Sequence, residues 1–344
     1  MSSILAKTEF NAWTGRLVRR LRRRYNDHCI GIVTYHSVSA RPSVFTDDTG
    51  LRIHPVAFER QIEYLESNFR PTALREVIAA LEERRRLERA IVITFDDGYA
   101  DNLRCAFPIL YRRRIPMTVF PVASIIGNAD LLWQHKLAWL IRYGHADRVG
   151  AAFSSAGYPP GHDGEQIADY ARRCFRPDLP EILESVLEIA GTNGRTLAGR
   201  FRPYVEPDEV AKADPEFVEF GNHTLTHPVL SSLSGDRQRA EIAGGFDQIK
   251  RLTGRPPTSF AYPFGLKPHY SEVTEKLVVE TGHRAALDMR RRINTGTRSP
   301  FDLSRKPAAC GSQARFERMI EDWPDNAAAR STGRQQDIVR IGGF

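Results

Sequence analysis

Two adjacent carboxylates follow a short apolar run in the first third of the chain. The run at 91–94 is typical of a buried β-strand, and Asp96, Asp97 and Gly98 come just after it. Adjacent like charges repel and cost stability unless positive charge lies nearby. Taken alone, the pair is more typical of a helix cap or a surface turn, so its function depends on the groups that other segments bring to it.

Two histidines four residues apart are candidate partners for these carboxylates. His223 and His227 lie in the segment GNHTLTHPVL at 221–230, after a predicted strand. A neutral imidazole is a good zinc ligand, and two histidines at this spacing can meet one ion from a turn or a first helical turn. With one carboxylate they would form a three-ligand site with open positions, as in catalytic zinc sites. The histidine pair alone is also compatible with a structural role, and the HExxH motif is absent.

Alternating strand-like and helix-like segments are predicted to position both groups. Apolar runs typical of strands occur at 30–38, 91–94, 116–123, 216–224, 258–263 and 284–288, and helical periodicity occurs at 56–69, 74–86, 102–114, 235–253 and 271–281. This alternation predicts parallel strands joined by helical crossovers. The acidic pair and the histidine pair both follow predicted strands, whose carboxyl ends are where active sites of α/β barrels gather.

The chain divides into five regions. We expect a basic amphipathic helix at 1–28, two parts of one α/β domain at 29–127 and 216–322, a helix-rich insertion at 128–215 and a loose polar tail at 323–344. Trp133 and His135 lie in a predicted helix of the insertion. We expect Trp133 to pack in a core, with a glycan-stacking role as the alternative, and assign no chemistry to His135.

Charge and hydropathy limit the partners of the protein. The formal net charge is +7, and part of the excess lies in RLVRRLRRRY at 16–25. We expect a solvated helix docked on the domain there, with attachment of residues 1–25 to an anionic membrane surface as the main alternative. No apolar run approaches about 18 residues and the cysteines have no paired spacing, which favours a cytoplasmic protein, with peripheral contact to the inner face of the membrane as an option. No nucleic-acid-binding motif accompanies the basic residues.

Several segments resemble the polysaccharide deacetylase family, carbohydrate esterase family 4, which includes nodulation-type chitooligosaccharide deacetylases. ITFDDGYADN, EFGNHTLTHPVLSSLS and FAYPFG resemble its first three motifs, and GIVTYHSV resembles the N-terminal YHxV motif of one branch. The resemblance implies a distorted (β/α) barrel of about seven parallel strands. It also implies one divalent metal ion held by Asp97, His223 and His227, with zinc expected and nickel or cobalt as alternatives.

The same resemblance assigns roles in catalysis. Asp96 would be the general base, and the backbone N–H of Phe264 would stabilise the oxyanion. The C-terminal LxH motif that gives most members their general acid is missing, so His36 in TYHSV takes that role, with a strand-end structural histidine as the alternative. Many members carry an arginine at the position of Ala261. Arg305 is the candidate replacement, although we favour a surface salt bridge for it.

The predicted function is metal-dependent removal of N-acetyl groups from amino sugars of a polysaccharide, an oligosaccharide or a glycolipid. One alternative is an amidohydrolase of the same fold that acts on a non-sugar C–N bond, because fold does not fix substrate. Another is a catalytically silent barrel that binds a glycan or a membrane surface. The sequence indicates neither a nucleic-acid partner nor an oligomeric state.

Overall fold

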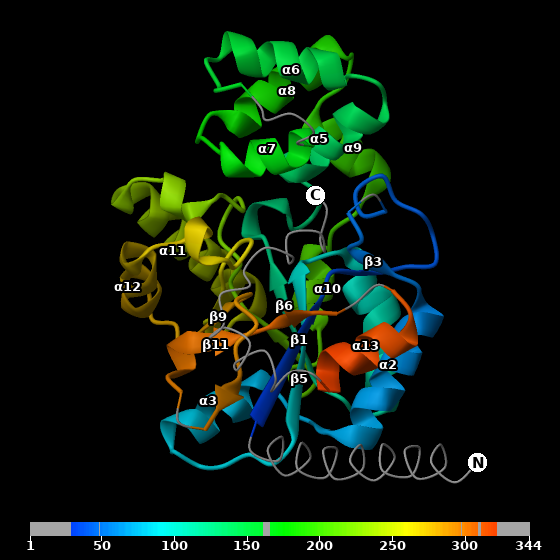
Figure 1. Cartoon of the computed structure of the whole chain (residues 1–344), viewed down its shortest axis with the longest axis vertical. Helices are drawn as coiled ribbons and strands as arrows, with labels where there is room; N and C mark the ends of the chain where they lie inside the picture. The colour runs from blue at the N-terminus through cyan, green and yellow to red at the C-terminus, as the bar shows by residue number, and fades with distance from the viewer. Residues whose placement is uncertain (1–28, 48, 161–165, 297, 309–310, 322–344) are drawn as a thin grey trace, which may run out of the picture.

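The computed structural model describes residues 29–321 except 48, 161–165, 297 and 309–310, and shows a mostly parallel α/β fold capped at one end by helices (Figure 1). The helix predicted at 1–28 and the tail predicted at 323–344 lie outside the described residues. Within the described part of the chain, we find no helix that is both long and apolar enough to cross a membrane.

A seven-stranded sheet forms the larger part of the barrel. Its path is β10-β1-β5-β6-β7, with β12 also paired to β1 and β4 to β5. The strands are β1 (Cys29–Tyr35), β4 (Arg70–Pro71), β5 (Ala90–Asp97), β6 (Met117–Pro121), β7 (Val218–Phe220), β10 (Asn294–Thr295) and β12 (Lys306–Pro307). All the pairings are parallel except that of β10 with β1.

A second, three-stranded sheet completes the curvature. It contains β8 (Ser259–Ala261), β9 (Ala285–Asp288) and β11 (Leu303–Ser304), all parallel, and a bridge between Asn222 and Phe260 connects it to the chain after β7. Arg305 lies between β11 of this sheet and β12 of the larger one. The two sheets therefore meet on both sides, which confirms the predicted distorted barrel. The short strands β2 (Ser37–Val38) and β3 (Arg52–Ile53) pair outside it.

Helices cover the barrel and join its strands. They are α2 (Pro55–Asn68), α3 (Leu74–Glu82), α4 (Phe107–Arg112), α11 (Gly235–Thr253), α12 (Glu272–Glu280) and α13 (Gln313–Glu321). The predicted helix at 102–114 is instead a π-helical turn, η1 (Asn102–Ala106), followed by α4. Pro108 lies in the first turn of α4 and has no N–H, so the regular hydrogen-bond ladder cannot continue through it.

Strand β5 sets the direction of the acidic pair. Ile91 and Ile93 pack in a cluster on the outer, helix-covered face, whereas Val92 packs with residues of the inner face. Because side chains alternate along a strand, Asp96 follows Val92 on the inner face. Asp97 ends the strand with a left-handed backbone, φ 67°, at the carboxyl end of β5.

In the described residues of the insertion, six α-helices lie between β6 and β7. They are α5 (Trp133–Arg142), α6 (Ala146–Ser155), α7 (Ile167–Arg173), α8 (Leu179–Ile189), α9 (Gly194–Phe201) and α10 (Pro207–Lys212). The buried apolar side chains of α5 to α9 form one cluster that also includes Val122, after β6, and Val229, two residues beyond His227, whereas Val210 of α10 packs in a separate cluster with Ile249 of α11. Helices α5 to α9 therefore pack on the carboxyl end of the barrel strands, as Figure 1 shows, and α10 lies beside the barrel.

Candidate metal centre

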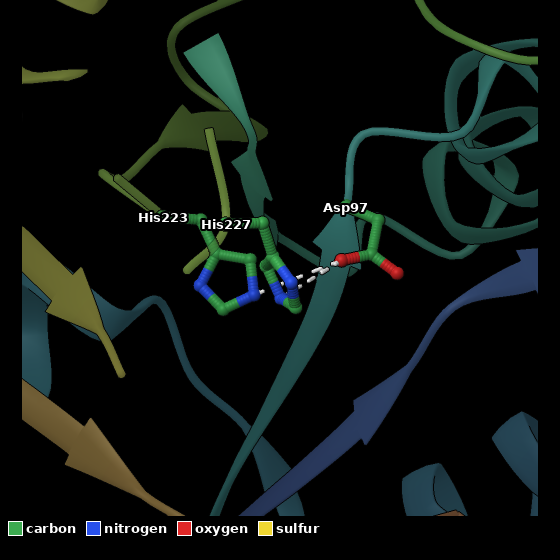
Figure 2. Close-up of side chains that lie close together, drawn as sticks. All are labelled: Asp97, His223 and His227. Carbon is green, nitrogen blue, oxygen red and sulfur yellow. Dashed lines mark ion pairs between the residues drawn. The ribbon is translucent and has the colours of Figure 1, made fainter. Parts of the chain in front are cut away.

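Asp97, His223 and His227 meet at the carboxyl end of the barrel. Asp97 ends β5, and both histidines lie in the loop that follows β7. The Oδ1 atom of Asp97 lies 3.7 Å from Nε2 of His223 and 3.6 Å from Nε2 of His227, and all three side chains are buried (Figure 2). Among the described residues, this is the only group of three ligand side chains close enough to hold one ion.

Unusual backbone geometry accompanies these side chains. Asp97, His227 and Phe264 have φ values of 67°, 63° and 59°, in the left-handed region that non-glycine residues rarely adopt. Such residues cost stability and cluster at functional sites. Gly98 has φ 72°, and a Cβ atom there would lie 2.6 Å from the Cβ of Pro121. Only glycine fits this position, which explains why it follows the acidic pair.

The hydrogen bonds of the two imidazoles leave their Nε2 atoms facing Asp97. Nδ1 of His223 lies 2.8 Å from the carbonyl oxygen of Ala261. A carbonyl only accepts, so Nδ1 carries the proton and Nε2 keeps its lone pair. Nδ1 of His227 contacts the carboxamide of Gln134. Metal-binding histidines characteristically donate from the second ring nitrogen, as His223 does here.

The electrostatics of the centre favour a cation. Burial, reinforced by the Asp96 carboxylate, raises the pKa of Asp97 to about 8, and burial lowers the pKa values of His223 and His227. The imidazoles are therefore neutral and add no positive charge. A divalent cation would compensate Asp97 and use the lone pairs of both Nε2 atoms, so the donor set fits a metal such as zinc.

Arg305 corrects one prediction from the sequence, because it forms no surface salt bridge. Its side chain is 0% exposed, and Nη1 and Nη2 donate to the two carboxylate oxygens of Asp96 at 2.6 and 2.8 Å. Burial favours the neutral acid, but the guanidinium outweighs it and lowers the pKa of Asp96 to about 2. Asp96 is therefore a stable anion next to the three candidate ligands.

His36 and Phe264 approach the same centre from other strands. His36 follows β1, is partly exposed, and its electrostatic neighbours are Asp96, Arg305 and His223. The ring of Phe264 lies 4.8 Å from that of His227, centre to centre. The backbone N–H of Phe264 has no acceptor among the described residues, so it is free to bind a substrate oxygen.

Sequence reasoning missed the contribution of the insertion to this centre. Trp133 is buried as expected, yet its Nε1–H donates to the carbonyl oxygen of His227 at 3.1 Å, and the next residue, Gln134, contacts the ring of that histidine. His135 is buried with both ring nitrogens on tyrosine hydroxyls. Gln134, His135 and Lys136 are three consecutive buried polar residues, and such a run beside apolar positions is the signal that could have identified the contact.

Comparisons with known proteins agree with this geometry. The polysaccharide deacetylase family model matches residues 83–286, more than half of the chain. The Bacillus subtilis (strain 168) protein YxkH is 29% identical over 115 residues, which is 33% of this chain and 39% of that protein. The match thus spans well under half of that relative.

Solved structures of two other proteins share the fold. Streptococcus pyogenes PplD in complex with acetate superposes with a TM-score of 0.56 at 16% identity, covering 84% of this chain and 96% of that one. IcaB from Ammonifex degensii gives a TM-score of 0.54 at 19% identity, covering 88% and 96%. The chain belongs to the polysaccharide deacetylase family, carbohydrate esterase family 4, and has its distorted barrel fold.

Proposed function

We propose that the protein hydrolyses N-acetyl groups of amino sugars in a polysaccharide, an oligosaccharide or a glycolipid. The observation that carries the proposal is the placement of the Asp96–Arg305 pair directly beside Asp97, His223 and His227. This arrangement puts a carboxylate that stays ionised next to a buried set of three ligands with room for one ion.

The residues present fit one divalent metal ion, most simply zinc, with nickel or cobalt as alternatives. Held by Asp97, His223 and His227, the ion would lower the pKa of a water molecule and polarise the acetyl carbonyl. Asp96 would take the proton from that water as the water oxygen attacks the carbonyl carbon. Arg305 would keep Asp96 ionised and fix the plane of its carboxylate.

Two further groups would complete the reaction. The free N–H of Phe264 would donate to the oxyanion as the carbonyl becomes tetrahedral. Burial lowers the pKa of His36 to about 4, against the opposing effect of Asp96, so its imidazole is neutral near pH 7. It must therefore receive a proton within the cycle, and the proton taken from water by Asp96 is the source in the site. His36 would pass it to the amine as the C–N bond breaks and acetate forms.

Acetate release from N-acetylglucosamine oligomers tests the proposal. Metal-stripped protein should release acetate only after Zn²⁺ is added, and an Asp96→Asn variant should bind zinc but release almost none. Tight zinc binding without acetate from the wild type would refute the substrate class and favour another C–N bond. Failure to bind any divalent ion would favour a catalytically silent barrel.

The cytoplasmic location and the membrane contact of residues 1–25 are further parts of the proposal. Membrane partitioning of the full chain and of a variant lacking residues 1–25 would test the contact. We expect less of the shortened variant in the membrane fraction if the basic residues bind anionic lipid, and equal partitioning would refute the contact.

A further inference from the structure

The first turn of helix α5, in the insertion, holds one candidate ligand from outside the barrel. Trp133 Nε1–H donates to the carbonyl oxygen of His227, and the His227 N–H donates to Oγ1 of Thr224 at 3.0 Å. These two bonds fix a residue whose left-handed backbone is unfavourable by itself. The backbone of His227 is thus positioned by the insertion as well as by its own loop.

The side chain of Gln134 contacts the ring of His227 at Nδ1. Its Nε2 faces Nδ1 of the imidazole, and its Oε1 is buried without a hydrogen-bond partner. With the carboxamide in this orientation, Nδ1 accepts a hydrogen bond from the Nε2–H of Gln134. The ring proton then lies on Nε2, facing Asp97, and that nitrogen has no lone pair for an ion.

Rotation of the Gln134 carboxamide by 180° reverses this arrangement with almost no change in shape. Oε1 then accepts a hydrogen bond from Nδ1–H, which gives the buried oxygen a partner. The lone pair of His227 Nε2 becomes available, 3.6 Å from Oδ1 of Asp97. The rotated orientation is therefore the one that suits metal binding.

We propose that Gln134 is a positioning residue that selects the metal-binding tautomer of His227. The proposal rests on the proposed function only through the ligand set Asp97, His223 and His227. The tautomer of His223 is fixed within the barrel by the carbonyl of Ala261, whereas that of His227 depends on a side chain of the insertion. The insertion is thus part of the metal centre and not only a cover over it.

Zinc affinity of the full chain, measured by competition with a chelator, tests the role of Gln134. Gln134→Met keeps the side-chain length but removes the acceptor, and we expect zinc binding to weaken about 10- to 100-fold. Gln134→Glu supplies only acceptors, so it should bind zinc at least as tightly as the wild type. Gln238→Met is the matched control, because Gln238 is also a buried glutamine with two hydrogen bonds, to Leu233 and Thr274. Its affinity should equal that of the wild type.

Absorption spectra of the cobalt-substituted proteins give a second readout. Gln134→Met should change the d–d bands, whereas Gln238→Met should reproduce the wild-type spectrum. Unchanged zinc affinity in Gln134→Met would overturn the proposal. If that variant does not fold, Gln134→Glu decides, since binding weaker than wild type by about tenfold or more would contradict the role of an acceptor at Nδ1.

The design separates this inference from the proposed function. If the wild type binds zinc but releases no acetate, the substrate class fails and the order of affinities still decides the role of Gln134. If the wild type binds no zinc, nickel or cobalt, the ligand set and the role of Gln134 fall together.

Discussion

Buried histidines occur in two kinds of surroundings in this protein, and the difference identifies the metal centre. His135 and His283 have both ring nitrogens within hydrogen-bond distance of other protein groups. His223 and His227 each use one nitrogen in this way and direct the other toward Asp97 at 3.6–3.7 Å, which is too long for a good hydrogen bond. An imidazole satisfied on both sides has no lone pair for an ion, so burial of a histidine alone does not indicate a metal site.

The adjacent carboxylates Asp96 and Asp97 also differ in whether the protein itself supplies their partner. Asp96 has a cation of the chain itself, the guanidinium of Arg305, and its pKa lies near 2. Asp97 has neutral imidazoles beside it, and burial together with the Asp96 carboxylate raises its pKa to about 8. The charge of Asp96 is thus balanced by a side chain of the protein itself. Asp97 would gain a directly bound counter-charge only from an added cation.

Replacement of Asp97 by asparagine should have the largest effect on zinc binding. The variant loses the anionic ligand, so tight zinc binding should disappear. Zinc at about 100 times its Kd should stabilise the wild type by about 2.7 kcal/mol and leave Asp97→Asn unchanged, as measured by thermal unfolding with and without zinc. A His283→Gln control should retain the zinc effect. One tightly bound zinc ion per chain in Asp97→Asn would show that the ligand assignment is wrong.

Replacement of Arg305, the cation that pairs with Asp96, should have the largest effect on the stability of the metal-free protein. Arg305→Met leaves Asp96 buried without a counter-charge, and we expect the free energy of unfolding to fall by about 3–5 kcal/mol in urea denaturation. Arg239→Met removes an exposed ion pair with Glu280 and should change stability by less than about 1 kcal/mol. Equal effects of the two substitutions would contradict the distinction between the carboxylates.

The pH dependence of stability should show that His283 is neutral in the folded protein. Its Nδ1–H donates to the carbonyl of Val278 at 3.0 Å, and Nε2 can then accept from the carboxamide of Asn222 at 3.1 Å. Burial lowers the pKa of His283 to about 4, from 6.5. The unfolded chain therefore binds the proton more readily, so the contribution is complete above pH 6.5 and is lost as the pH falls from 6.5 to 4.

The expected size of this loss is on the order of 2 kcal/mol between pH 7 and pH 5. The measurement is the free energy of unfolding against pH for the wild type and His283→Gln. The stability difference between the two proteins should shrink toward acid pH, because only the wild type titrates there at this position. A difference independent of pH would contradict a depressed pKa at His283.

Phe264→Ala should have the smallest effect. The variant keeps the backbone N–H and loses a ring that packs on His227. We expect kcat/KM for deacetylation to fall by less than about tenfold, whereas loss of an oxyanion donor typically costs about 100- to 1000-fold. A loss as large as that of a donor would mean that the aromatic side chain itself orients the substrate or the metal ligand.

The sequence by itself determined most of the barrel and the composition of its centre. Short apolar runs and helical stripes are local patterns, so they predicted the strand at 91–94 that leads to Asp97 and the crossovers around it. The spacing of His223 and His227 and the adjacent acidic pair identified candidate ligands that the structure brings together. The end of this strand was not predicted correctly, because β5 continues beyond residue 94 through both aspartates.

Only the tertiary structure decided which groups complete these side chains. Arg305 reaches Asp96 across 209 residues of sequence, because β11 and β12 lie where the two sheets meet. Gln134 reaches His227 across 93 residues, because the insertion packs on the carboxyl end of the barrel. Each partner is selected by long-range packing, and a local pattern encodes the polarity of a residue but not the group that it meets.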